Sequence, residues 1–103
     1  MSEIAEFRRR VDKAIGSQFM GSEIGRLYGM TKHGQRFAIV TSTVLWYAVR
    51  VVVDMDEYTA AVVGRRAFWT AADADGFVFD TQHNLERMTG IVTPDSPIPP
   101  LVL

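Results

Sequence analysis

Residues 36–53 decide the fold, and they read RFAIVTSTVLWYAVRVVV. The stretch is rich in valine, threonine and aromatic residues, which favour extended chain. Its charge-free part, 37–49, is ended by Arg50 and is shorter than the roughly 18 apolar residues that span a bilayer. We therefore interpret the stretch as buried sheet, formed either by two strands at 36–42 and 43–53 or by one long, bent strand.

The segment 43–53 is apolar on both of its expected faces. Alternate residues of a strand point to opposite sides of a sheet, and both sets are largely apolar here, apart from Arg50. A strand with this pattern belongs in the centre of a sheet that is covered on both sides. Two apolar faces also favour additional cover from a partner.

The N-terminal segment, from Ser2 to about Phe19, has the pattern of an amphipathic helix. Apolar residues recur three or four positions apart and form one stripe, made of Ile4, Phe7, Val11 and Ile15. Ser2 is suited to cap the helix, and Gly16 or Gly21 is suited to end it. The segment 2–12 is charged and lacks the apolar stretch of a signal peptide.

The segment 23–31 is predicted to be a strand or irregular chain that leads into a hairpin, and not a helix, because three glycines would cost a helix about 1 kcal/mol each. Gly21, Gly25 and Gly29 are spaced so that an extended chain places them on one bare face, against which a helix packs closely or the strand bends. Residues 32–35 then form the turn, with Gly34 supplying a positive φ.

Residues 58–70 leave two interpretations open. They form either a return strand after a turn at 54–57, or a helix capped by Asp54 in a capping-box pattern. In the helix, one face would hold Met55, Tyr58, Val62 and Trp69. Arg66 in the middle of that face argues against the helix, and Gly64 weakens both alternatives.

The C-terminal third is predicted to contain three short elements and a tail. These are a turn at 74–76, a strand at 77–79, and a helix at 82–89 capped by Asp80 or Thr81. All four prolines lie beyond residue 93, so the tail is expected to be extended. Its apolar ending favours docking on its own domain, on a dimer mate or on another partner.

These elements predict an α+β fold. An N-terminal amphipathic helix packs on a four- to five-stranded antiparallel sheet, followed by a short C-terminal helix and a Pro-rich tail. We expect a single domain over 1–93 and an extended tail over 94–103. A chain of 103 residues is enough for one core.

Composition excludes several classes of site. The chain has no cysteine, which rules out disulfides, zinc–thiolate sites and cysteine nucleophiles, and which fits a cytoplasmic protein. Its formal net charge of −1 creates no general attraction to nucleic acid or to acidic membranes. We predict no cofactor and no membrane association.

Sequence motifs for catalysis are absent. No phosphate-binding loop, dinucleotide fingerprint or serine-nucleophile elbow occurs. The carboxylates near 54–57 and 73–80 do not have calcium-loop spacing and are interpreted as turn residues, and no metal site is expected. Among weak catalytic candidates, His83 with Asp80 is the pair to test, because a carboxylate can orient an imidazole. The chain is thus not expected to be an enzyme.

Five residues are the candidates for an interface or a ligand pocket. They combine aromatic rings with arginine side chains, a pairing that is enriched at binding surfaces: Tyr47, Tyr58, Trp69, Arg65 and Arg66.

Three classes of function are compatible with these patterns. The leading hypothesis is a small protein-binding module, such as an inhibitor, an immunity or anti-defence protein or an assembly factor, which acts through an apolar and aromatic surface as a homodimer. The first alternative is a small-molecule binder or enzyme with a cavity between the helix and a curved sheet. The second is nucleic-acid binding through Arg65 and Arg66 beside aromatic residues.

Overall fold

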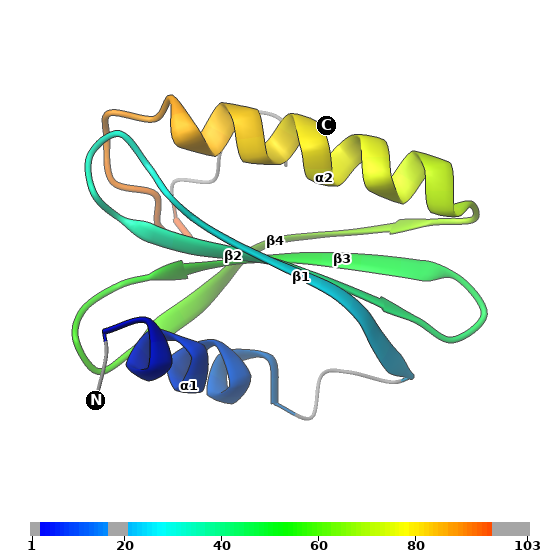
Figure 1. The fold of residues 1–103 in the computed structure, drawn as a ribbon, viewed down its shortest axis with the longest axis horizontal. Coiled ribbons are helices and arrows are strands. Elements are labelled where there is room, and N and C mark those ends of the chain that lie inside the picture. Colours follow the sequence, from blue (N-terminus) through cyan, green and yellow to red (C-terminus); the bar gives the residue numbers. More distant parts are fainter. Residues whose placement is uncertain (1–2, 17–20, 96–103) are drawn as a thin grey trace.

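The protein is a four-stranded antiparallel sheet with one helix on each face (Figure 1). The computed structural model describes residues 3–16 and 21–95. The sheet is a simple meander in the order β1-β2-β3-β4. The elements along the chain are α1 (Glu3–Ile15), β1 (Ser22–Met30), β2 (Arg36–Thr43), β3 (Tyr47–Asp54), β4 (Ala60–Phe68) and α2 (Ala71–Glu86).

The predicted α+β class is confirmed, and the central strands are β2 and β3. Both of their faces are buried, which produces two separate apolar clusters. The cluster between α2 and the sheet includes Phe37, Ile39, Val49, Val51 and Leu85. The cluster between α1 and the sheet consists of Phe7, Val11, Ile15, Ala38, Val40 and Val52. The stretch 36–53 thus contributes central residues to both apolar clusters.

Helix α1 follows its predicted stripe. Phe7 and Val11 are fully buried against β2 and β3, and Ile15 is nearly so. Gly16, with φ of 35°, follows the last helical residue, as expected for a helix end. The proposed cap Ser2 and the possible last residue Phe19 lie outside the described residues.

A turn at 44–46 corrects the predicted boundary between the two central strands. Thr43 pairs with Tyr47 as the last pair of the β2–β3 ladder, and the Val44 N–H donates to the Trp46 carbonyl at 3.2 Å. The prediction of a strand over 43–53, and the alternative of one bent strand, were therefore wrong. The turn contains no glycine, proline or asparagine, so it carries none of the usual turn signals.

The strand interpretation of 58–70 is confirmed by β4, which contains a bulge. Val51 faces Gly64 whereas Val52 faces Val62, so Val63 is the extra residue. A bulge inserts one residue and changes which side chains share a face. Val62 therefore faces α1, whereas Arg66 faces α2.

The predictions for 74–89 were wrong, because one continuous helix replaces the turn, the strand and the short helix. The Thr70 hydroxyl caps α2 by accepting a hydrogen bond from the Asp73 N–H at 3.2 Å. Asp80 therefore lies inside the helix, and no fifth strand is present in the described part of the chain. Gly76 costs a helix about 1 kcal/mol, which burial of the inward face offsets. That face holds Ala74, Thr81 and Leu85.

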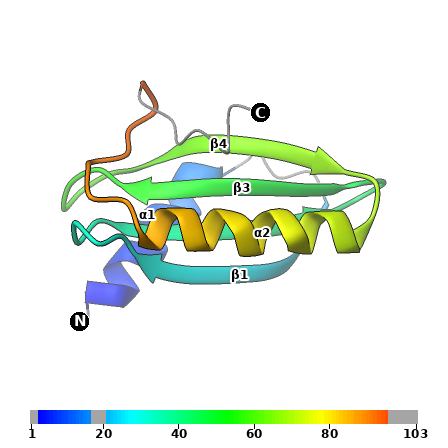
Figure 2. The same ribbon diagram turned by 90° about the horizontal axis from the view of Figure 1, so that it is seen from above.

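Helix α2 covers the face opposite α1 and runs along the strands (Figure 2). Neither α1 nor α2, the two helices of the described chain, is both long and apolar enough to cross a membrane.

Gly29 is the position where β1 must lack a side chain. It pairs with Phe37, and a Cβ built on it would lie 2.4 Å from the Phe37 ring. The absence of a side chain on this face of β1 is therefore required at Gly29. The space is occupied by the Phe37 ring of β2, and not by α1.

We predict that Gly29→Ala destabilises the fold by about 1–3 kcal/mol, because overpacking a filled core displaces its neighbours. Gly25→Ala, in the same strand, is the matched control because a Cβ there meets nothing within 4 Å. Urea unfolding measures both. Equal midpoints for the two variants would contradict the close approach of Gly29 to Phe37.

Candidate functional site

Four of the exposed apolar side chains lie at one end of the sheet. The β2–β3 turn and the junction between β4 and α2 both lie at this end, on the right of Figure 2. Leu45 and Trp69 are each 81% exposed. A hollow of about 270 Å³ joins the two segments, lined by Trp46, Ala67, Phe68 and Trp69. We call the exposed group the aromatic end: Val44, Leu45, Trp46 and Trp69.

The position of Trp69 follows from the residues on either side of it. Phe68 points toward α2, where its ring centroid lies 5.3 Å from that of Phe77. Thr70 caps α2 in an extended conformation. Trp69 lies between this inward ring and the helix cap, and its side chain is left in solvent.

The adjacent Arg65 and Arg66 do not form one basic patch. The Arg66 guanidinium lies over the rings of Phe68 and Phe77, 5.3 and 5.4 Å from their centroids. Arg65 points to the opposite face, where it pairs across the strands with Arg50 of β3. Their separation follows from the alternation of side chains along β4.

A second hollow lies beside the aromatic end, on the face of the sheet that α1 covers in part. Its volume is about 230 Å³, and we call it the arginine hollow. Arg50 and Arg65, which are paired on adjacent strands, both line it. Burial lowers the pKa of the Arg50 guanidinium, as does the charge of Arg65. The hollow is lined by Trp46, Ala48, Val49, Arg50, Arg65, Arg66 and Ala67.

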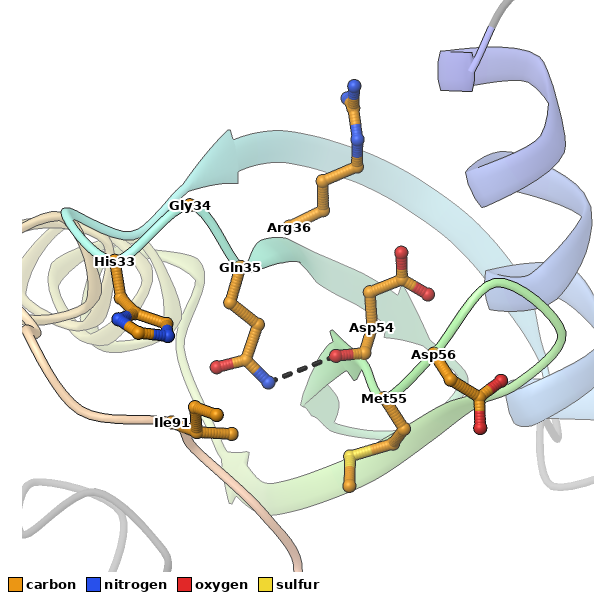
Figure 3. Close-up of a pocket in the computed structure, with 8 residues that line it drawn as sticks. All are labelled: His33, Gly34, Gln35, Arg36, Asp54, Met55, Asp56 and Ile91. Carbon is orange, nitrogen blue, oxygen red and sulfur yellow. Dashed lines mark hydrogen bonds between the residues drawn. The ribbon is translucent and has the colours of Figure 1, made fainter.

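The opposite end of the sheet holds a hollow of about 360 Å³ near the β1–β2 and β3–β4 turns (Figure 3). Gln35 organises it: its side-chain amide donates to the Asp54 carbonyl at 3.0 Å and to the Val92 carbonyl at 2.8 Å. Its side-chain oxygen accepts from the Val92 N–H at 2.8 Å. Gln35 therefore ties the chain after α2 to the sheet.

The carboxylates of Asp54 and Asp56, near this hollow, accept hydrogen bonds from other groups of the protein. Both oxygens of Asp54 accept from the Arg10 guanidinium at 2.9 Å, and this hydrogen-bonded pair raises the pKa of Arg10. Asp56 accepts from the backbone N–H groups of Tyr58 and Thr59. In the described ranges, 3–16 and 21–95, no three His, Asp or Glu side chains gather as metal ligands. These carboxylates therefore stabilise the β3–β4 turn and its contact with α1.

The weak catalytic candidates, His83 and Asp80, lie on the solvent side of α2. The His83 ring packs on Phe79 at 4.2 Å, and its Nδ1 lies 3.0 Å from the Phe79 carbonyl oxygen. The hollows described here include neither residue in their linings.

The five predicted interface residues fall in three places. Trp69, Arg65 and Arg66 lie at or beside the aromatic end. Tyr58 is exposed in the turn at the opposite end of the sheet, whereas Tyr47 is half-buried and packs on the cluster beneath α2.

The sequence did not predict the exposed turn residues 44–46 or the position of Arg50 beside Arg65. A signal for Arg50 was present, since it is the one charged residue within the apolar run 37–53. The apolar residues 44–46 carry no comparable signal, because a hairpin turn made of such residues has the same composition as a strand.

Comparisons with known protein families, curated proteins and solved structures find no match to this chain.

We predict that Leu45→Ser and Trp69→Ala each change the free energy of unfolding by no more than about 0.5 kcal/mol, because exposed side chains contribute little to folding. The fully buried Leu85 provides the contrast, and Leu85→Ala should cost about 2–5 kcal/mol. Urea unfolding measures all three variants. A large loss at Trp69 would mean that this ring belongs to the core.

We also predict that the Asp56 carboxyl titrates below its ordinary pKa, because the N–H of Tyr58, followed by that of Thr59, stabilises the charged form. A depressed folded-state pKa gives stability that is present above the unfolded pKa of about 3.9 and is lost as the pH falls through the folded value. NMR titration measures the pKa directly. Asp56→Asn should weaken the loss of unfolding free energy as the pH falls into the acid range. An Asp56 carboxyl that titrates at its ordinary pKa would contradict the prediction.

Proposed function

We propose that this protein is a small protein-binding module that uses its aromatic end as the contact surface. The observation that carries the proposal is the exposure of Leu45 and Trp69, 81% each, beside the partly exposed Trp46. Tryptophan and arginine dominate the binding energy of many interfaces. Apolar groups gathered on one surface favour burial against another macromolecule.

The gain available from covering this end is substantial. Burial of one large apolar side chain contributes roughly 1.5–3 kcal/mol. The aromatic end offers several such side chains within one continuous region, and arginines border it. Such an arrangement matches the usual anatomy of an interface, with an apolar centre and a polar rim.

The aromatic end is also held in place before any partner arrives. The turn at 44–46 closes the central hairpin through the Val44–Trp46 hydrogen bond. The junction at 68–70 is fixed by the Phe68–Phe77 contact and by the Thr70 cap. A preorganised surface loses less conformational entropy on binding, which favours affinity.

The small-molecule alternative has weaker support. It requires an enclosed, largely apolar pocket with converging polar groups. The hollows at both ends of the sheet open to solvent instead. His83 and Asp80, the polar groups considered for such a site, line none of them.

Within this proposal, the partner is either a second copy of the chain, which would make a homodimer, or a different protein. The second case includes the roles of inhibitor, immunity or anti-defence protein and assembly factor. The cytoplasm remains the predicted location, on the basis of the cysteine-free sequence.

The test is a capture experiment combined with a size measurement. Tagged protein is used to retain partners from cells that naturally contain it, and light scattering over a concentration series measures self-association. We predict that Leu45→Ser and Trp69→Ala each abolish the retained partner or the dimer. The controls are Ile91→Ser and Tyr58→Ala, which truncate exposed apolar residues at the opposite end.

Two results would overturn the proposal. One is a strictly monomeric protein that retains no partner in stoichiometric amount. The other is a partner or dimer that tolerates Leu45→Ser and Trp69→Ala but is lost with the control variants.

A further inference from the structure

The aromatic end presents both an exposed apolar side chain and a hollow that the same side chain does not fill. Leu45 is the middle residue of the β2–β3 turn and is 81% exposed. Beside it lies the hollow of about 270 Å³, here called the apolar hollow, which Leu45 of the same chain does not line. The residues that line the apolar hollow are Trp46, Ala67, Phe68 and Trp69.

The apolar hollow has the size and the lining to hold a leucine side chain. Its volume of about 270 Å³ corresponds to roughly nine water molecules in the liquid, which is room for an isobutyl group. Three aromatic rings and an alanine methyl group form its walls. Such walls favour an apolar occupant, because a charged group placed among them would lose its hydration.

A second copy of the chain carries both of the matching parts. A two-fold contact uses the same surface on both copies, so a two-fold axis at this end can place Leu45 of each copy in the apolar hollow of the other. Each copy then buries its own leucine and has its own hollow filled. A different protein would have to supply an exposed apolar group and a cavity for Leu45 at matching positions.

The exposed area at this end is sufficient for such a contact. Trp69 is as exposed as Leu45, and Val44 and Trp46 are partly exposed. Together these side chains offer roughly 400–500 Å² per copy, since one tryptophan can bury about 150–250 Å². Two copies would therefore bury about 1,000 Å², the area expected of a biological interface. The net charge of −1 creates little repulsion between them.

We propose that the protein forms a two-fold homodimer in which Leu45 of each copy inserts into the apolar hollow of the other. This inference rests on the proposed function and identifies the occupant of its contact surface as a second copy of the chain. The insertion brings Leu45 against Trp46 and Trp69 of the other copy. All three side chains are thereby removed from water, which is the driving force for association.

The first test measures the dimer dissociation constant of the full-length protein and its variants by sedimentation equilibrium. Leu45→Ala removes most of the inserted side chain, and Ala67→Leu fills the hollow from its wall. Because each change acts in both equivalent contacts, each should raise the dissociation constant at least about tenfold. Tyr58→Ala truncates an exposed ring at the opposite end of the sheet and should leave the constant unchanged.

The second test mixes the two weakened variants. In the mixed pair, the intact leucine of one copy enters the open hollow of the other, while the shortened side chain at position 45 meets the filled hollow. We predict that the two variants associate with each other about tenfold more tightly than either associates with itself. Native mass spectrometry identifies the mixed dimer by its mass. Positions 45 and 67 are both exposed, so both variants should fold, and their urea midpoints verify this.

Tryptophan fluorescence gives an independent measurement at the contact itself. Trp46 and Trp69 are the only tryptophans of the chain, and both line the apolar hollow. Their emission should shift to shorter wavelength as the protein concentration rises and the dimer forms. The same dilution series with Leu45→Ala should show the shift only at higher concentration.

Three outcomes would overturn the inference. They are a protein that stays monomeric up to millimolar concentration, a Leu45→Ala dimer as tight as that of the unchanged protein, and a mixture of variants no tighter than its components. The proposed function is judged separately. If the protein is monomeric but Leu45→Ser and Trp69→Ala release a different captured protein, the binding module stands and the homodimer is refuted.

Discussion

Two central strands with apolar side chains on both faces are the constraint on which the structure depends. β2 and β3 cannot leave either face in water, so the sheet requires a cover on each side. α1 supplies one cover and α2 supplies the other (Figure 1). Alternation along the strands then assigns neighbouring residues to opposite layers, as with Ala38 beneath α1 and Ile39 beneath α2.

The two helices are unequal in length, and the arginine hollow lies on the part of the sheet that the shorter helix, α1, leaves uncovered. α1 has 13 residues and α2 has 16. α1 packs against Ala38, Val40 and Val52, whereas the arginine hollow lies farther along β3 and β4, near the β2–β3 turn. The bulge at Val63 contributes as well, because it sets which of Arg65 and Arg66 faces which layer. A local irregularity in one strand thus arranges the charges of the site.

The two ends of the sheet differ in how their polar groups are used. At the end with the β1–β2 and β3–β4 turns, Gln35, Asp54 and Asp56 have their hydrogen bonds within the protein. At the aromatic end, large side chains are exposed and arginines border an open hollow. The first end stabilises the fold, whereas the second leaves large apolar side chains exposed beside an open hollow.

The sequence by itself determined the α1 stripe, β1, the turn at Gly34 and the extended, buried character of 36–53, although not the boundary between β2 and β3. Each of these depends on periodicity, on apolar composition or on a residue with special backbone freedom. Only the tertiary structure decided that 71–86 is one helix, since burial of Ala74 and Leu85 outweighs the cost of Gly76. It also decided the site. Trp69 and Arg65 were found from their residue types, but their proximity to Trp46 and Arg50 depends on strand register and on a turn without a local signal. Contacts between distant segments arise from packing, which no single stretch of sequence encodes.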